Sequence, residues 1–340
     1  METEEAATGP GVVTRPSVRA AVAQATPVPF DRAATLQVVQ TWAQRAAAAD
    51  VDVLVFPEAF VGGYPKGSVF GAVVGDRTQA GREEFARYAN AAITVPGDDV
   101  THLAEITAAA ALHLVIGVVE RDGGTLYCTV LFFSPTGEFL GKRRKLMPTG
   151  AERLIWGYGD GSTMDVYDTA VGRLGAVICW ENLMPAARMA MYAKGIELYC
   201  APTADGRDGH HATMRHIAQE GRCFVLAANQ VTRVRDFPPG HFAADADPDM
   251  VISRGGSSII GPLGQVLAGP EYDAEALLVA DLDLAEIIQA KYDFDVIGHY
   301  ARPDVFQLLV NEAPAIPVAP MHGSPSSAFA GRPTSRVISA

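Results

Sequence analysis

Short runs of apolar residues recur along the chain, and most are apolar at nearly every position. Examples are VRAAVAQA (18–25), VDVLVF (51–56) and CFVLAANQ (223–230). Continuous apolar strands are typical of sheets that are covered on both faces. Residues 31–50 are rich in alanine, with apolar residues at helical spacing and an acidic first turn, which predicts a helix between the first two runs. The sequence therefore predicts an α/β fold in which sheets lie between helical layers.

Both halves of the chain alternate helices with apolar strands, although no sequence repeat aligns the two halves. The spacing predicts further helices over 77–94, 98–112, 184–195, 206–222 and 284–292. It predicts further strands over 112–120, 125–135, 172–179 and 196–202, and strands around turns within 255–270 and 276–283.

Composition limits the partners that this chain can have. Of its 340 residues, 49% are hydrophobic and 19% are charged, which provides a substantial core and excludes global disorder. The formal net charge of −12 argues against nucleic acid and anionic membranes as partners, because both attract basic surfaces. No apolar run approaches the roughly 20 residues needed to cross a bilayer. The acidic N-terminus is unlike a signal peptide, so we expect a cytoplasmic protein.

The chain divides into three parts by composition. Residues 1–16 are expected to form a flexible arm, and residues 17–311 a single domain. Residues 312–340 are rich in Pro, Ala and Ser, which predicts a mobile C-terminal tail.

One buried-looking strand stops abruptly at the segment AVICWENLMP (176–185). Its apolar residues are followed by Cys179, Trp180 and Glu181, so a thiol stands beside a charged group. A lone cysteine is usually core filler, and the other three (Cys128, Cys200 and Cys223) lie in apolar runs and are interpreted in that way. The alternative for Cys179 is a nucleophile held on a turn.

Two other apolar runs also end in charged residues. VLVFPEAF ends near Glu58, and GKRRKLMPTGAER carries Lys145 at the end of a cationic run and Glu152 beyond it. Each feature alone is more often a cap or a solvated face. In an open α/β arrangement, however, strand ends gather at one rim of the sheet, so these groups are expected to meet Cys179.

Such a group of residues has a definite chemistry. The thiolate is the reactive form of cysteine, and a nearby base must generate it. Glu58 is the candidate base, and Lys145 is the candidate stabiliser of negative charge on the substrate. Together with Cys179 they suffice for attack on a carbon that is doubly or triply bonded to a heteroatom.

Three segments resemble the catalytic segments of the nitrilase (carbon–nitrogen hydrolase) superfamily. They are FPEAFVGGYP (56–65), RRKLMPTGAERLIWGYGDGS (143–162) and the stretch from Gly175 to Asp208 that contains Cys-Trp-Glu-Asn. The last of these resembles the nitrilase branch. Two later segments, 255–270 and 298–306, also resemble nitrilases, so the likeness covers roughly residues 18–306.

The resemblance implies a four-layer α-β-β-α sandwich and assigns Glu58 as base, Lys145 as charge stabiliser and Cys179 as nucleophile. It implies that Glu152 orients the lysine and assists proton transfer. It further implies a small nitrile substrate, no metal or organic cofactor, and homo-oligomers from dimers to spirals. Tyr64 and Trp180 are expected to be pocket walls, with simple core packing as the alternative.

Other enzyme classes are less consistent with the sequence. A papain-like enzyme has histidines available, including His216 and His299, but the motif around a papain-type cysteine is missing and His216 is expected to be a mid-helix packing residue. A metal site from His210, His211 and His216 lacks the i, i+4 spacing that places ligands on one helical face. A non-catalytic member of the same fold is expected to lose the nucleophile, which is present here. Within the superfamily, an amidase or a cyanide-hydrating enzyme remains the alternative.

Overall fold

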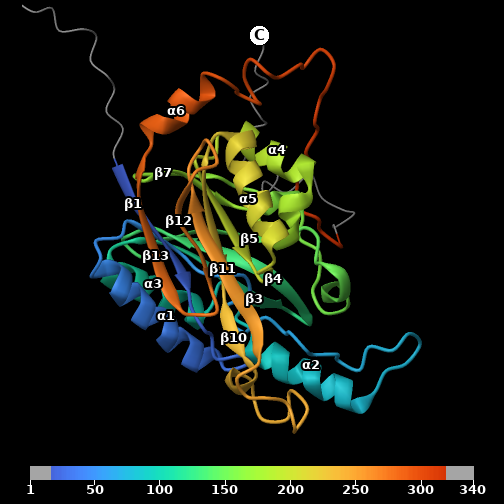
Figure 1. The fold of residues 1–340 in the computed structure, drawn as a ribbon. Coiled ribbons are helices and arrows are strands. Elements are labelled where there is room, and N and C mark those ends of the chain that lie inside the picture. Colours follow the sequence, from blue (N-terminus) through green and yellow to red (C-terminus); the bar gives the residue numbers. More distant parts are fainter. Residues whose placement is uncertain (1–16, 319–340) are drawn as a thin grey trace, which may run out of the picture.

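Two β-sheets packed face to face form the centre of the molecule in the computed structural model, which describes residues 17–318 (Figure 1). The N-terminal arm predicted for 1–16 lies outside the described residues, as do residues 319–340 of the predicted tail. The described part of that tail contacts the domain. Glu312 pairs with Lys194 at 2.7 Å, and the Ala315 N–H donates to Asp160 at 2.7 Å.

The first sheet has six strands in the order β13-β1-β2-β3-β4-β5. Strands β1, β2 and β3 are parallel and the remaining neighbours are antiparallel. The strand bounds are β1 Ser17–Gln24, β2 Val53–Val55, β3 His113–Asp122, β4 Thr125–Phe133, β5 Phe139–Arg144 and β13 Ala276–Asp283.

The second sheet has seven strands in the order β10-β11-β9-β8-β7-β6, with β12 paired to β11. Its central strands β7, β8 and β9 are also parallel, so each sheet has three parallel strands and antiparallel edges. The strand bounds are β6 Tyr167–Thr169, β7 Gly172–Ala176, β8 Leu198–Thr203, β9 Phe224–Asn229, β10 Val231–Arg233, β11 Val251–Ile260 and β12 Val266–Tyr272.

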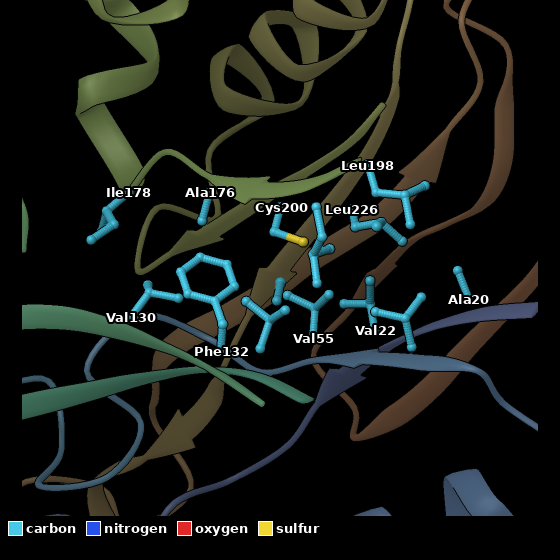
Figure 2. Close-up of a cluster of buried hydrophobic side chains, with 14 of the residues drawn as sticks. Ala20, Val22, Val55, Val130, Phe132, Ala176, Ile178, Leu198, Cys200 and Leu226 are labelled. Atoms are coloured by element: carbon cyan, nitrogen blue, oxygen red, sulfur yellow. The ribbon is translucent and has the colours of Figure 1, made fainter. Parts of the chain in front are cut away.

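The main core lies between the two sheets. Val22, Val55 and Phe132 of the first sheet face Cys200 and Leu226 of the second, and all five are buried (Figure 2). Neighbouring residues on the same strands point to the outer faces and are buried there too. This double burial explains why the strands are apolar at nearly every position.

Helices cover the outer face of each sheet. Helices α1 and α3 pack on the six-stranded sheet through side chains that include Trp42 and Leu103, and α4 and α5 pack on the other through side chains that include Met191 and Ile217. The predicted α-β-β-α sandwich is therefore confirmed. The helix bounds are α1 Arg32–Ala47, α2 Gln79–Ala91, α3 Asp98–Ala110, α4 Pro185–Ala193, α5 Asp208–Gly221 and α6 Ala285–Lys291.

The helix ends follow local chemistry. Asp31 precedes α1 and caps it by accepting from the Ala34 N–H at 2.9 Å, so it acts as the N-cap and not as a first-turn residue as we expected. Pro185 opens α4, where its missing N–H costs nothing, and Gly195 follows the end of this helix with a φ of 72°.

No helix among residues 17–318 is long and apolar enough to cross a membrane.

A glycine on β3 lets the loop after β2 approach the sheet closely. A Cβ added to Gly117 would lie 2.2 Å from the Pro57 carbonyl oxygen and 2.7 Å from the Glu58 Cα. Both contacts are with main chain and cannot be relieved by rotating a side chain. The position of Glu58 therefore depends on the missing side chain of Gly117.

We expect Gly117→Ala to lower the free energy of unfolding by about 1–3 kcal/mol through overpacking and to displace Glu58. Thermal or urea unfolding measures the first effect. Gly124→Ala is the control, because a Cβ at Gly124 meets nothing within 4 Å. Equal stability of the two variants would contradict this packing.

Candidate active site

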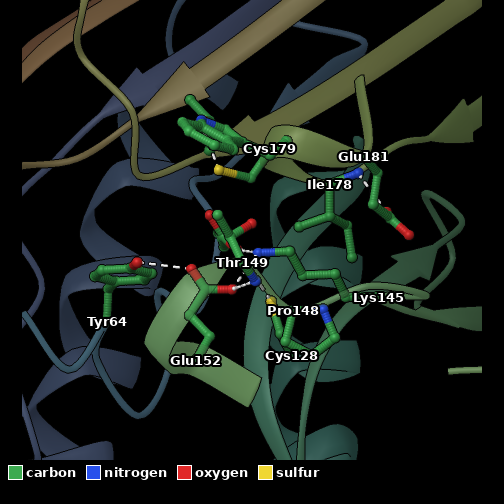
Figure 3. A network of polar contacts seen from close by, with 12 residues as sticks. Tyr64, Cys128, Lys145, Pro148, Thr149, Glu152, Ile178, Cys179 and Glu181 are labelled. Atoms are coloured by element: carbon green, nitrogen blue, oxygen red, sulfur yellow. Dashed lines mark hydrogen bonds and ion pairs between the residues drawn. The ribbon is translucent and has the colours of Figure 1, made fainter. Parts of the chain in front are cut away.

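The ends of strands from both sheets meet at one place. Glu58 lies three residues beyond β2 of the first sheet, and Lys145 directly follows β5. Cys179 lies three residues beyond β7 of the second sheet (Figure 3). The structure therefore brings together the thiol, the carboxylate and the ammonium that the sequence analysis singled out.

The centre of this site is a buried group of three charges. The Lys145 ammonium donates to Glu58 Oε1 at 2.6 Å. It also donates to Glu152 Oε2 at 2.7 Å (Figure 3). The exposed fractions of Glu58, Lys145 and Glu152 are 0%, 1% and 9%. Glu152 also accepts from the Thr149 N–H at 2.6 Å and from the Tyr64 hydroxyl at 2.7 Å, so the bonds from Lys145 connect two well-anchored carboxylates.

Burial and mutual charge shift the titration of these groups. Burial raises the pKa of Glu58, and the charge of Glu152 raises it further, while Lys145 and the Cys179 thiol oppose the shift. Burial alone lowers the pKa of Lys145, but the negative groups around it outweigh that effect and hold its pKa well above the usual value. Lys145 therefore stays an ammonium, while Glu58 is a carboxylate that takes up a proton readily.

Cys179 begins a short 3-10 turn, Cys179–Leu183, in a strained backbone conformation. Its φ of 52° lies in the left-handed region, which non-glycine residues seldom adopt. The Thr203 hydroxyl donates to the Cys179 sulfur at 3.3 Å. Burial, and then the negative charge of Glu58, raise the pKa of the thiol. The resting thiol is therefore protonated and must pass its proton to a base before it can attack.

The charge beside the thiol in the sequence points away from it in the structure. Glu181 is buried and turned toward Arg143, whose guanidinium lies 3.3 Å from Glu181 Oε2. Its two oxygens also accept from the main-chain N–H groups of Leu146 at 2.6 Å and Ile178 at 2.9 Å. Glu181 thus ties the turn that carries Cys179 to the segment that carries Lys145.

The side chain of Asn182 holds the same turn from within. Its Nδ2 donates to the carbonyl oxygens of Val177 at 3.0 Å and Cys179 at 2.7 Å, and its Oδ1 accepts from the Tyr199 hydroxyl at 2.7 Å. All of the polar atoms of this side chain are thus engaged with the turn or with β8. These bonds offset the cost of the positive φ at Cys179.

A cavity of about 600 Å³ opens above the sulfur. Cys179, Glu152, Tyr64 and Trp180 are among the residues that line it. Trp180 is 39% exposed, which is inconsistent with simple core packing. Its indole N–H donates to Asp205 at 2.8 Å, so the ring is held in place at the cavity wall.

The histidines of the alternative classes do not assemble with Cys179. His216 is in α5, as the sequence predicts, but its side chain is 64% exposed and lies 3.9 Å from Glu220, so the expected packing role is wrong. The polar partners of the Cys179 sulfur are Thr203 and the Ala204 backbone, and its thiol also interacts with Glu58. Residues 17–318 contain no group of three or more His, Cys, Asp or Glu side chains arranged to hold a metal ion.

The sequence profile of the carbon–nitrogen hydrolase family matches residues 19–292, which is most of the chain. The chain belongs to the carbon–nitrogen hydrolase family. It is therefore a hydrolase that acts on carbon–nitrogen bonds, and its recognition as a nitrilase from the three sequence segments is confirmed.

Two curated relatives and one solved structure illustrate this membership. The chain is 59% identical over 298 residues to an aliphatic nitrilase of Sinorhizobium fredii, covering 87% of this chain and 96% of that one. It is 56% identical over 309 residues to the bifunctional nitrilase/nitrile hydratase NIT4B of Nicotiana tabacum, covering 89% of each. A carbon–nitrogen hydrolase from Helicobacter pylori is 20% identical with a TM-score of 0.68, covering 86% of this chain and 98% of that one, and shows the shared fold.

Several residues of this hydrolase site were not found by sequence reasoning. They are Arg143, Glu181, Asn182 and Thr203, which support Cys179 or its turn, and Cys128, whose thiol contacts Glu58 at 3.4 Å. The sequence held a signal for Arg143, because successive side chains of residues 142–145 point to opposite faces if the run is a strand. Read with period two, the cationic run predicts two inward and two outward charges.

We expect removal of Glu181 to destabilise the fold, because it leaves the Arg143 charge buried without its partner. The expected loss for Glu181→Ala is about 3–5 kcal/mol of unfolding free energy, measured by urea denaturation. Asp168→Ala is the control, because its ion pair with Arg173 is solvent-exposed and is expected to contribute less than about 1 kcal/mol. Similar losses in the two variants would contradict a buried ion pair that holds the Cys179 turn.

Proposed function

We propose that the protein hydrolyses a small organic nitrile to the carboxylic acid and ammonia, with Cys179 as nucleophile. The observation that carries the proposal is the convergence of the Cys179 thiol, the free oxygen of Glu58 and the Lys145 ammonium beneath one cavity. No other arrangement among residues 17–318 combines a strained nucleophile turn with a buried base and a fixed cation. The names of the close relatives agree with it.

The first step forms a covalent bond to the enzyme. The Cys179 sulfur attacks the nitrile carbon while its proton passes to Glu58, and one electron pair of the triple bond moves to the nitrogen. Lys145 and main-chain N–H groups near Cys179 stabilise that negative charge. Glu58 passes the proton to the nitrogen, which gives a thioimidate and restores the carboxylate. Burial raises the pKa of Glu58, which favours this transfer, and raises the pKa of the Cys179 thiol, which opposes it. The proton therefore leaves the sulfur as the S–C bond forms, and no free thiolate is needed.

Water completes the reaction in two additions. Glu58 takes a proton from the first water while the oxygen of that water adds to the thioimidate carbon. The product is a tetrahedral centre that bears nitrogen, oxygen and sulfur. Cleavage of the C–N bond releases ammonia and leaves a thioester on Cys179. A second water cleaves the C–S bond, which releases the acid and restores the thiol. The net reaction consumes two waters for each nitrile.

The cavity and its walls support a small substrate. Its volume of about 600 Å³ suits a nitrile with a short chain or one ring, and Tyr64 and Trp180 are proposed as the walls that orient it. An amide would meet the same three groups, so amide hydrolysis is the alternative within the family. The nitrile is preferred because relatives that share 53–59% of their residues with this chain are named nitrilases.

The oligomeric state is inferred from the family resemblance, and the location is inferred from the composition of the sequence. We infer a homo-oligomer, from a dimer to a spiral, and a cytoplasmic location. Size-exclusion chromatography with light scattering measures the first, and cell fractionation measures the second.

Cys179→Ala is expected to abolish ammonia release from nitriles, because the nucleophile is lost with little change in volume. Cys179→Ser is expected to be nearly inactive, because the buried base is matched to a thiol and a hydroxyl is far less acidic. A panel of aliphatic, arylaceto- and aromatic nitriles, with ammonia, acid and amide measured together, provides the assay.

Cys223→Ala is the matched control, because Cys223 is a buried thiol in the separate core under α4 and α5. It is expected to change stability and not the rate of the folded enzyme. Substantial ammonia release by either Cys179 variant would overturn the assignment of the nucleophile.

The fate of the tetrahedral intermediate should depend on Glu152. A carboxylate near the nitrogen favours its cationic form, so ammonia leaves and acid is the main product. We expect the remaining activity of Glu152→Gln to shift toward amide, because that negative charge is removed. Chromatography of acid and amide from one nitrile, for wild type and variant, measures the ratio. An unchanged ratio would mean that Glu152 only positions Lys145.

A further inference from the structure

The second thiol near the site, Cys128, is not simple core filler. It lies on β4, and the sequence interpretation as a core residue is correct as to burial. Its sulfur nevertheless lies 3.4 Å from Glu58 Oε1 and donates a hydrogen bond to it. The same residue's carbonyl oxygen accepts from the Lys145 N–H at 2.8 Å, so Cys128 contacts both of the groups that face the nucleophile.

The two oxygens of Glu58 are treated differently by their surroundings. Oε1 accepts hydrogen bonds from both the Lys145 ammonium and the Cys128 thiol. Oε2 is buried and has no hydrogen-bond partner among residues 17–318. An unpaired buried carboxylate oxygen is costly unless it is used. Oε2 is thus the oxygen available to receive a proton.

The torsion that turns a carboxylate about its last bond is soft and roughly two-fold. One donor at 2.6 Å holds Oε1 near Lys145 but leaves the plane of the carboxylate poorly defined. A second donor from another strand fixes that plane. A carboxylate with one oxygen fixed by two donors presents its other oxygen in one orientation.

We infer that Cys128 is a positioning residue for Glu58: its thiol, together with Lys145, anchors Oε1 so that Oε2 stays free to take the Cys179 proton. This inference rests on the proposed function, because Glu58 is the base in that mechanism. It assigns two different roles to two buried thiols of one site. Cys179 reacts with the substrate, and Cys128 orients the base and does not touch the substrate.

The direction of the expected effect follows from the bond. A donor to the carboxylate stabilises the ionised form and lowers its pKa. Loss of the Cys128 thiol should therefore raise the pKa of Glu58, and proton transfer from Cys179 should begin at a higher pH. A merely structural role would lower the stability of the protein without moving the acid limb of the pH–rate profile.

The experiment compares wild type with Cys128→Ala and Cys128→Ser. Cys200→Ala is the matched control. Cys200 is a fully buried thiol of the same core, and burial is the one cause that raises its pKa. Alkylation of Cys179 by iodoacetamide is followed across pH by peptide mass spectrometry, and nitrile turnover is followed in parallel. If Cys128→Ala does not fold, Cys128→Val fills the space without restoring a donor.

We expect Cys128→Ala to slow both alkylation and nitrile turnover near neutral pH by about tenfold, which is equivalent to the loss of one hydrogen bond to a charged group. We also expect the acid limb of the pH–rate profile to move to higher pH. KM should change little. Cys128→Ser should restore the limb because its hydroxyl donates to the same oxygen, and Cys200→Ala should match wild type.

Profiles for Cys128→Ala or Cys128→Val that coincide with that of Cys200→Ala would overturn the inference, and so would a folded Cys128→Ser that behaves like Cys128→Ala. A failure of the proposed function looks different. In that case alkylation of Cys179 responds to Cys128 as expected, but wild type releases neither acid nor ammonia from nitriles.

Discussion

The Lys145 ammonium between Glu58 and Glu152 is the interaction on which the rest of the site depends. Two carboxylates buried side by side would repel each other, and one would take up a proton. One fixed cation, 2.6 and 2.7 Å from them, makes it possible for both to be buried. The three groups still carry one excess negative charge. Burial, together with this excess, raises the pKa values of both the Cys179 thiol and Glu58.

The sandwich makes this arrangement rigid. Glu58 and Lys145 come from the first sheet, and Cys179 comes from the second, so the site exists only where the two sheets pack together. Because the sheets share one apolar core, relative movement of Glu58 and Cys179 would require that core to repack. Burial is costly for each charge alone, but the packing that buries the charges also holds them in a fixed geometry.

A second set of bonds supports the strained turn at Cys179. Glu181 and Arg143 connect the turn to the segment with Lys145, Asn182 binds the turn from within, and Thr203 contacts the sulfur itself. Their contribution is to hold a backbone conformation that a cysteine would not adopt alone. The Cys179 side chain is thereby held where it lines the cavity.

Sequence patterns determined the fold class, because strands apolar at nearly every position require cover on both faces, and they indicated Glu58, Lys145 and Cys179 through the charged ends of three such strands. The four-layer order and the role of Glu152 came from the family resemblance. The tertiary structure decided which neighbours of these residues face the site. Glu181 turns away from Cys179, which is close to it in the chain, and toward Arg143. Cys128 turns toward Glu58, although the two residues are 70 positions apart. The physical reason is that side-chain spacing along a strand or turn gives the direction of each side chain, but only the packing of one sheet on the other determines what lies in that direction.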